Sequence, residues 1–210
     1  ELPNAKQLQE FEGNIRYHSL VHEDMKRFFQ YFPSNAHPMG ILSAMVNSLS
    51  TFYPKSQTPN RPSKDVERTI YRLIAKMPTL AAISYKNNLG HPYMYPDNRL
   101  GYVENFLHMM YGLPTEEYVA DPVVVDALNK LLILHADHEQ NCSASTVRMV
   151  GSSQANLYSA ISAGIAALWG PLHGGANVAV LEMLEQIHRG GLTPEQCIKL
   201  AKDKTSGFKL

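Results

Sequence analysis

Several sequence features that indicate particular classes of function are scarce or absent in this sequence. Its 210 residues carry 19 Lys and Arg against 19 Asp and Glu, so the formal net charge is zero. Without an excess of positive charge, neither a nucleic acid nor an anionic membrane surface is an expected partner. The longest mostly apolar stretch, 155–169, contains polar residues and is too short to cross a bilayer. No secretory signal opens the chain.

Cysteine is also scarce. Only Cys142 and Cys197 are present, and neither belongs to a CxxC or metal-type spacing. We expect free thiols in a reducing compartment, and hence a cytoplasmic location, rather than a disulfide framework. The chain opens on Glu1 rather than Met, and it ends on an apolar and basic pattern, so we interpret it as a piece of a longer protein.

The alternation typical of β-strands is nearly absent, and the predicted fold class is mainly α. Proline, glycine and capping residues predict helices over 39–53, 66–86, 100–111, 122–136, 154–169, 176–188 and from 194 onward. Pro78 is expected to kink the second of these helices. Ser153 is the predicted N-cap of the helix over 154–169, and Thr193 with Gln196 has the spacing of a capping box.

Three of these helices, over 66–86, 122–136 and 154–169, are apolar around most of their circumference. A helix of this kind is buried on all sides, and a domain of this size has little other material to surround three of them. We therefore expect them to pack against a second copy across a two-fold axis. The alternative is that another part of a longer chain covers them. Small residues in 154–169 would permit close approach of a neighbouring helix.

The densest polar cluster is HADHEQNCSAST at 135–146, directly after the apolar run LLIL. His135 and His138 are three residues apart, so they fall on one face of a last helical turn, where the helix dipole favours a cationic imidazole. Two other interpretations remain open. The histidines could be buried and hydrogen-bonded to backbone carbonyls, or His135, Asp137, His138 and His173 could bind a metal, although no HExxH pattern is present.

The segment GPLHGGAN at 170–177 presents His173 between Pro171 and the pair Gly174-Gly175. We expect the glycines to allow left-handed or strained backbone geometry. The residues that follow predict a helix, so His173 would lie just before a helix N-terminus, where the dipole favours a neutral imidazole that can polarise a substrate carbonyl. A turn with an incidental histidine is the alternative. Two histidine sites in opposite helix-terminal fields together favour enolisation chemistry.

Longer segments carry a resemblance to a known family. They are VHEDMKRFFQYFPSNAHPM (21–39), AKMPTLAA (75–82), YPDNRLGYVENFLHMMYG (95–112), LHADHEQNCSASTVR (134–148), GSSQAN (151–156) and SAISAGIAALWGPLHGGAN (159–177). Over essentially its whole length the chain resembles citrate synthase, specifically the bacterial type that assembles beyond the dimer. Asp137, Gln140 and Leu172 favour this family over the related 2-methylcitrate synthases, which remain an alternative. Another alternative is a helical module that dimerises and has no catalytic activity.

The resemblance implies a condensation of acetyl-CoA with oxaloacetate, followed by hydrolysis of the thioester to citrate and CoA. This reaction belongs to the tricarboxylic acid cycle and needs no metal and no cofactor, since acetyl-CoA is a substrate. On the family's pattern, His173 is catalytic and hydrogen-bonds the acetyl thioester carbonyl. His138 contacts oxaloacetate, Asn141 and Ser143 lie in the same binding site, and His135 supports it.

The resemblance also implies a domain organisation. Residues 1–173 would belong to a large helical domain, whose helices 39–53, 66–86, 122–136 and 154–169 form the interface of a homodimer, with a hexamer as the larger assembly. Residues 174–210 would begin a small domain.

Other parts of the family's machinery match no residue of this sequence. The catalytic aspartate, the carboxylate-binding arginines and a second oxaloacetate histidine, in a GFGHRVY-like stretch, are expected beyond Leu210. We therefore expect the 210 residues to be inactive by themselves. NADH inhibition is common in the bacterial type, and the resemblance implies that Arg72, Lys76 and Tyr53 belong to such a regulatory site.

Overall fold

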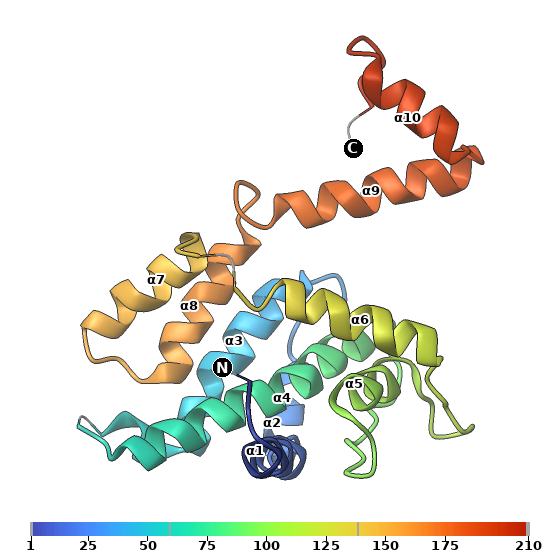
Figure 1. Cartoon of the computed structure of the whole chain (residues 1–210). Helices are drawn as coiled ribbons and strands as arrows, with labels where there is room; N and C mark the ends of the chain where they lie inside the picture. The colour runs from blue at the N-terminus through green and yellow to red at the C-terminus, as the bar shows by residue number, and fades with distance from the viewer. Residues whose placement is uncertain (1, 59, 138, 209–210) are drawn as a thin grey trace. The chain divides into compact units, whose positions relative to one another are not determined.

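The computed structural model describes residues 2–58, 60–137 and 139–208. Within these ranges the secondary structure consists of helices alone, which confirms the mainly α prediction (Figure 1). The elements are α1 (Ala5–Tyr17), α2 (Glu23–Phe29), α3 (Pro38–Phe52), a short 3-10 helix η1 (Pro54–Gln57), α4 (Ser63–Leu89), α5 (Tyr102–Tyr111), α6 (Pro122–Leu134), α7 (Cys142–Ser152), α8 (Leu157–Trp169), α9 (Gly175–Gly190) and α10 (Pro194–Lys202).

The chain divides into two compact units, residues 1–166 and 167–210, and the division falls near the end of α8. The family domains expected over 1–173 and 174–210 remain a prediction. None of the described helices is both long and apolar enough to span a membrane. The prediction of free thiols is confirmed, since Cys142 is exposed, Cys197 is buried and both are reduced.

Helix α4 is the centre of the first unit and packs against α1, α2, α3 and α5. Its apolar side chains meet those of α3 in one buried cluster, which also takes in Tyr158 of α8. Burial of this cluster is the main stabilising contribution to the unit, at about 25 cal/mol for each Å² of apolar surface removed from water. Its largest members on the two helices are Ile41, Met45, Leu49, Leu73, Leu80 and Ile83.

The helix predicted over 66–86 is longer, from Ser63 to Leu89, and it continues through Pro78. It ends at Gly90, whose φ of 68° is the left-handed geometry that favours glycine. The helix predicted over 122–136 begins at Pro122 as expected but ends at Leu134. His135 is therefore the C-cap of α6 and not a residue of its last turn.

Helix α7 was not predicted from the sequence, and its position corrects the predicted start of α8. Ser153 is the C-cap of α7, so it does not cap the next helix. Asn156 takes that place, because its Oδ1 accepts the backbone N–H of Ser159 at 3.0 Å. The capping box at the start of α10 is present as predicted, with Thr193 and Gln196 bonded to each other's backbone.

Small residues of α8 allow close approach of neighbouring helices, as the sequence predicted, and the neighbours lie in the same chain. Ser43 of α3 and Ser162 of α8 each donate a hydroxyl to the other's carbonyl, at 3.0 and 2.8 Å. On another face of α8, a Cβ built on Gly164 would lie 2.6 Å from Val147 Cγ2 of α7. Glycine is therefore required where α7 and α8 meet.

The helix α6 does not meet the expectation that it is buried on all sides. It has no buried residue in this chain. Three of its apolar side chains, Val123, Ile133 and Leu134, are 75%, 73% and 74% exposed. Such a run of exposed apolar side chains is unusual for a helix that faces water permanently.

Candidate functional site

His173 lies in a tight turn between α8 and α9, in the second unit. Its backbone N–H donates to the Gly170 carbonyl at 3.0 Å, and the N–H of Gly174 donates to the same oxygen at 2.9 Å. The side chain is half-buried, and α9 begins two residues later at Gly175. The predicted position of His173, just before a helix N-terminus, is confirmed.

The expected reason for the two glycines was wrong. Gly174 has a φ of −84°, which any residue adopts, and Gly175 is the first residue of α9. What position 174 requires is space, because a Cβ there would overlap the carbonyl oxygen of Leu168. At Gly175 a Cβ would meet nothing within 4 Å. Gly174 therefore lets the turn that carries His173 fold back closely on the end of α8.

The polar cluster after α6 lies in the first unit. His135 Nδ1 is 2.7 Å from the Leu131 carbonyl oxygen. Since a carbonyl oxygen only accepts, Nδ1 carries the proton and Nε2 is the remaining ring nitrogen. This contact with its own helix is of the kind that a supporting residue makes. His138, the predicted oxaloacetate ligand, lies outside the described residues.

Two features beside His138 were not found from the sequence. Glu139 has a φ of 55°, a left-handed conformation that a non-glycine residue seldom adopts, and its N–H donates to the Asp137 carboxylate at 2.9 Å. Strained backbone of this kind is concentrated at functional sites. One sequence signal could have predicted this turn. Asp137 lies two residues before Glu139, and an Asp at that spacing can accept a backbone N–H and form a turn.

Asn141 and Ser143 fix the start of α7. Asn141 Oδ1 accepts the N–H of Ala144 at 2.9 Å, so Asn141 is the N-cap of the helix. Ser143 Oγ donates to the Gly164 carbonyl at 2.8 Å, which joins α7 to α8. Both predicted site residues thus have structural contacts, and their part in binding remains a prediction.

The described residues include no group of three or more His, Cys, Asp or Glu side chains arranged to hold a metal ion. The metal interpretation from the sequence used His138, which is not among them.

The residues predicted for regulation lie together in the first unit. The guanidinium carbon of Arg72 is 4.2 Å from the ring centre of Tyr53, and Lys76 Nζ is 5.9 Å from it. Tyr53 in turn stacks on Tyr158, with ring centres 5.7 Å apart and planes 16° apart. Burial raises the pKa of Tyr53, and the Arg72 charge opposes that rise.

Lys76, unlike Arg72, is not accessible to a ligand. It is only 3% exposed, and its ammonium group donates to the carbonyls of His18, at 2.6 Å, and of Leu20. These carbonyls belong to the C-terminal cap of α1 and the residues after it, where the helix leaves backbone carbonyls without donors of its own. Lys76 therefore holds α1 against α4.

Arg72 and Tyr53 also line a pocket of about 300 Å³ beside η1. Arg61, Arg68 and Lys55 bring three more cationic side chains to it, against the single carboxylate of Asp65. The buried Oγ of Ser56, in the same lining, has no hydrogen-bond partner among the described residues. The spacing of Arg68 and Arg72, four residues apart on one helix, was the signal that could have predicted this basic pocket.

Comparison with known proteins shows what this arrangement is related to. The chain is 56% identical over 210 residues to citrate synthase 1 of Mycobacterium tuberculosis, in both strain CDC 1551 / Oshkosh and strain H37Rv. The match covers 100% of this chain and 48% of each relative. The chain therefore spans about half the length of these curated relatives.

Solved structures show the same fold. Citrate synthase from Pyrobaculum aerophilum matches with a TM-score of 0.80 and 30% identity, over 100% of this chain and 52% of that one. A ternary complex of carboxymethyl coenzyme A and oxaloacetate with citrate synthase from Thermoplasma acidophilum matches with a TM-score of 0.79 over the same shares, and its 24% identity supports the fold alone. The family model "Citrate synthase, C-terminal domain" matches residues 1–209, and the chain belongs to the citrate synthase family.

Proposed function

We propose that this chain is the part of a citrate synthase that carries His173, and that the whole protein condenses acetyl-CoA with oxaloacetate in the tricarboxylic acid cycle. The family uses no cofactor, since acetyl-CoA is a substrate. The observation that carries the proposal is His173 in its turn before α9, within a chain that matches the family model throughout. We propose the cytoplasm as its location.

In the proposed reaction, a general base removes a proton from the methyl group of acetyl-CoA. His173 donates a hydrogen bond to the thioester oxygen, where the negative charge of the enolate develops. The enolate carbon then attacks the keto carbon of oxaloacetate to form a citryl thioester. Water cleaves the thioester and releases citrate and CoA.

His138, Asn141 and Ser143 are proposed to bind substrate. His138 would contact oxaloacetate, Asn141 and Ser143 would lie near His138 and the acetyl-CoA end of the site, and His135 would support it. The hydrogen bonds of Asn141 and Ser143 support a positioning role, because they fix the first turn of α7 next to the segment that contains His138. The sequence has no GFGHRVY-like stretch. We therefore propose that these 210 residues need the rest of the family's machinery for activity.

Substitution of His173 in the full-length enzyme tests the catalytic role. His173→Ala is expected to lower kcat by about 10²-fold to 10³-fold, as loss of one donor to a developing oxyanion does elsewhere. His188→Ala, at an exposed histidine in α9, is the matched control and should leave kcat unchanged. Normal citrate formation by His173→Ala, or by the 210 residues alone, would contradict the proposal.

Oxaloacetate binding tests the role of His138 separately. Oxaloacetate should raise the unfolding temperature of the full-length enzyme, because it binds the folded state. His138→Ala should abolish that rise. The ratio of kcat/KM for acetyl-CoA to that for propionyl-CoA distinguishes this function from the alternative, 2-methylcitrate synthesis.

A homodimer, or a hexamer built from it, is the proposed assembly. The exposed apolar side chains of α6 support it, because a second copy would remove them from water. Sedimentation of the full-length protein tests the assembly, and Ile133→Asp should weaken the dimer. If the unmodified protein is a monomer at micromolar concentration, the homodimer is ruled out. The alternative of a non-catalytic helical dimerisation module predicts a dimer that forms no citrate.

NADH regulation is a second proposal for the basic pocket. Four cationic side chains and the Tyr53 ring, already stacked on Tyr158, suit a ligand that combines phosphates with aromatic rings. Arg72→Ala should weaken NADH binding, whereas Lys64→Ala, an exposed residue on the same helix, should not. Because Lys76 is buried, Lys76→Ala should act through stability. Unchanged NADH binding in the Arg72→Ala, Lys76→Ala double variant would refute the regulatory role.

A further inference from the structure

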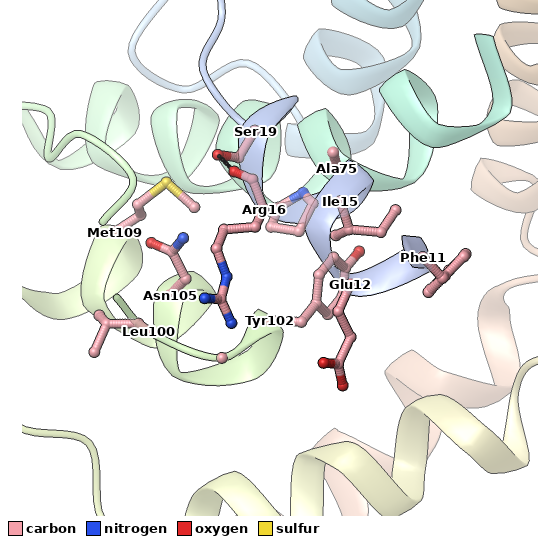
Figure 2. A pocket seen from close by; sticks show the side chains of 12 residues that line it. Phe11, Glu12, Ile15, Arg16, Ser19, Ala75, Leu100, Tyr102, Asn105 and Met109 are labelled. Atoms are coloured by element: carbon pink, nitrogen blue, oxygen red, sulfur yellow. Dashed lines mark hydrogen bonds between the residues drawn. The ribbon is translucent and has the colours of Figure 1, made fainter. Parts of the chain in front are cut away.

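A second pocket, with no role in the proposed functions, lies between α1, α4 and α5. It has a volume of about 190 Å³. Figure 2 shows the side chains that line it. Its walls are largely apolar, and the lining includes Phe11, Ile15, Ala75, Pro78, Leu100 and Met109. A pocket of this size is smaller than the sites that hold drug-sized ligands, and it suits a small molecule with an apolar body.

Only the oxygen of the Asn105 side-chain amide is hydrogen-bonded to another residue of the described chain. Asn105 is only 7% exposed, and its Oδ1 accepts the N–H of Asp97 at 2.9 Å, which fixes the orientation of the amide. Within the described part of the chain, Nδ2 has no hydrogen-bond acceptor, and the residue lines the pocket. Because Nδ2 is not among the fully buried polar atoms, it is accessible from the pocket, where a ligand oxygen can accept its N–H.

Arg16 brings a second donor group to the same pocket. Its guanidinium group makes no ion pair or hydrogen bond with any described residue. In Figure 2 the Arg16 side chain, from α1, and the Asn105 side chain, from α5, reach the same part of the pocket, while the Glu12 carboxylate points elsewhere. The N-terminal residues of α5, Gly101 and Tyr102, also line the pocket, but the Glu104 carboxylate already accepts the Gly101 N–H at 2.9 Å, so this helix end adds no free donor for a ligand.

From these contacts we propose that the pocket binds a small carboxylate with an apolar body. The carboxylate accepts from the Arg16 guanidinium and from Asn105 Nδ2, and the body lies against Ile15, Pro78 and Met109. A guanidinium group and a fixed amide donor match the planar geometry of a carboxylate, and charge-assisted hydrogen bonds supply most of the selectivity. Glu12, in the same lining, opposes the negative charge and limits the affinity.

Hexanoate is the probe, and hexan-1-ol and inorganic phosphate are its controls. The protein is labelled with ¹³C at its methionine methyl groups, and the Met109 signal is assigned with Met109→Leu. Hexanoate should shift the Met109 signal and bind at least about tenfold more tightly than hexan-1-ol, because the alcohol lacks the charge. Phosphate alone should not shift the signal, because it has no apolar body.

Charge variants test the contacts individually. Arg16→Gln should weaken hexanoate binding about tenfold, and Glu12→Gln should strengthen it. Asn105→Asp keeps the oxygen that accepts the Asp97 N–H but loses the donor, and it should abolish binding. Lys6→Gln removes one positive charge from α1 outside the lining and should change nothing.

Three results would overturn the proposal. They are no shift of Met109 at any hexanoate concentration, equal affinity for hexan-1-ol, and unchanged affinity in Arg16→Gln or Asn105→Asp. Neither the Arg16→Gln nor the Glu12→Gln substitution touches His173 or the polar cluster after α6. Failure of this proposal therefore leaves the proposed citrate synthase activity unaffected.

Discussion

The hydroxyl of Tyr102 in α5 donates to the carbonyl oxygen of Ile74 in α4 at 3.0 Å. Ile74 lies four residues before Pro78, which has no N–H to give to that carbonyl. The tyrosine therefore replaces the helical hydrogen bond that the proline removes. Burial raises the pKa of Tyr102 to about 12, so the hydroxyl keeps its proton at every physiological pH. This contact is one reason that α4 continues through Pro78.

Tyr102→Phe should lower the free energy of unfolding by about 0.5–1.5 kcal/mol, the net contribution of a typical hydrogen bond, because it leaves the Ile74 carbonyl without its donor from the protein. The loss should be smaller in a Pro78→Ala background, where residue 78 can donate its own N–H. Urea unfolding of the four proteins of this double-mutant cycle measures the difference. Tyr111→Phe is the control, since the Tyr111 hydroxyl has no hydrogen bond to a described residue. Equal losses in both backgrounds would show that Tyr102 does not act through Ile74.

The fold was predictable where helices are long and apolar. Helices α3, α4, α6 and α8 follow from their apolar residues and their proline or glycine boundaries. Helix α7, CSASTVRMVGS, has few apolar residues and many with low helix propensity, so periodicity missed it. Its stability depends on the Asn141 cap and on contacts with Gly164 of α8, which are tertiary interactions that no local pattern reveals.

The candidate site was predictable in outline, because the sequence placed His173 before a helix. The role of Gly174 was not, since the close approach of the Leu168 carbonyl depends on how the turn folds back on α8. The role of Lys76 was also missed. A lysine on a helix is expected to face water, and the burial of this one depends on the carbonyls of His18 and Leu20, far away in sequence.

Gly174→Ala should disturb the turn that carries His173, because the added methyl group overlaps the Leu168 carbonyl oxygen. In the full-length enzyme we expect kcat to fall about tenfold or more, since small displacements of a catalytic group are costly. Gly175→Ala is the matched control, and its methyl group would meet nothing within 4 Å. Steady-state kinetics of the two variants provide the test. If the two neighbours behave alike, space at position 174 does not position His173.

Gly164→Ala should destabilise the contact between α7 and α8 by about 1–3 kcal/mol, the usual cost of overpacking. Its Cβ would lie 2.6 Å from Val147 Cγ2, so α7 and α8 would have to move apart at this point. Gly151→Ala, in α7 with nothing within 4 Å of its Cβ, should be neutral or slightly stabilising. Thermal unfolding compares the two. In a Val147→Ala background the Gly164→Ala loss should shrink, and an unchanged loss would assign the cost elsewhere.

The lowered pKa of Lys76 predicts that the stability of the protein depends on pH. Burial lowers the pKa of Lys76 from 10.5 to about 8, and the Arg72 charge adds to this effect. Between these two values the unfolded chain holds a proton that the folded chain has released, so the contribution of Lys76 to stability rises with pH. The contribution is complete above the unfolded pKa and is lost as the pH falls through the folded one. A neutral amine still has two N–H groups, enough for the carbonyls of His18 and Leu20.

The measurement is the free energy of unfolding of the unmodified protein and of Lys76→Met, from pH 7 to pH 10. The difference between them should change in favour of the unmodified protein above about pH 8, by at most about 1.4 kcal/mol for each pH unit. Lys64→Met, which removes an exposed lysine from the same helix, is the control. Its free energy of unfolding should follow the same pH dependence as that of the unmodified protein from pH 7 to pH 10. A parallel curve for Lys76→Met would mean that Lys76 keeps an ordinary pKa, because the two carbonyls then stabilise its charged form as well as water does.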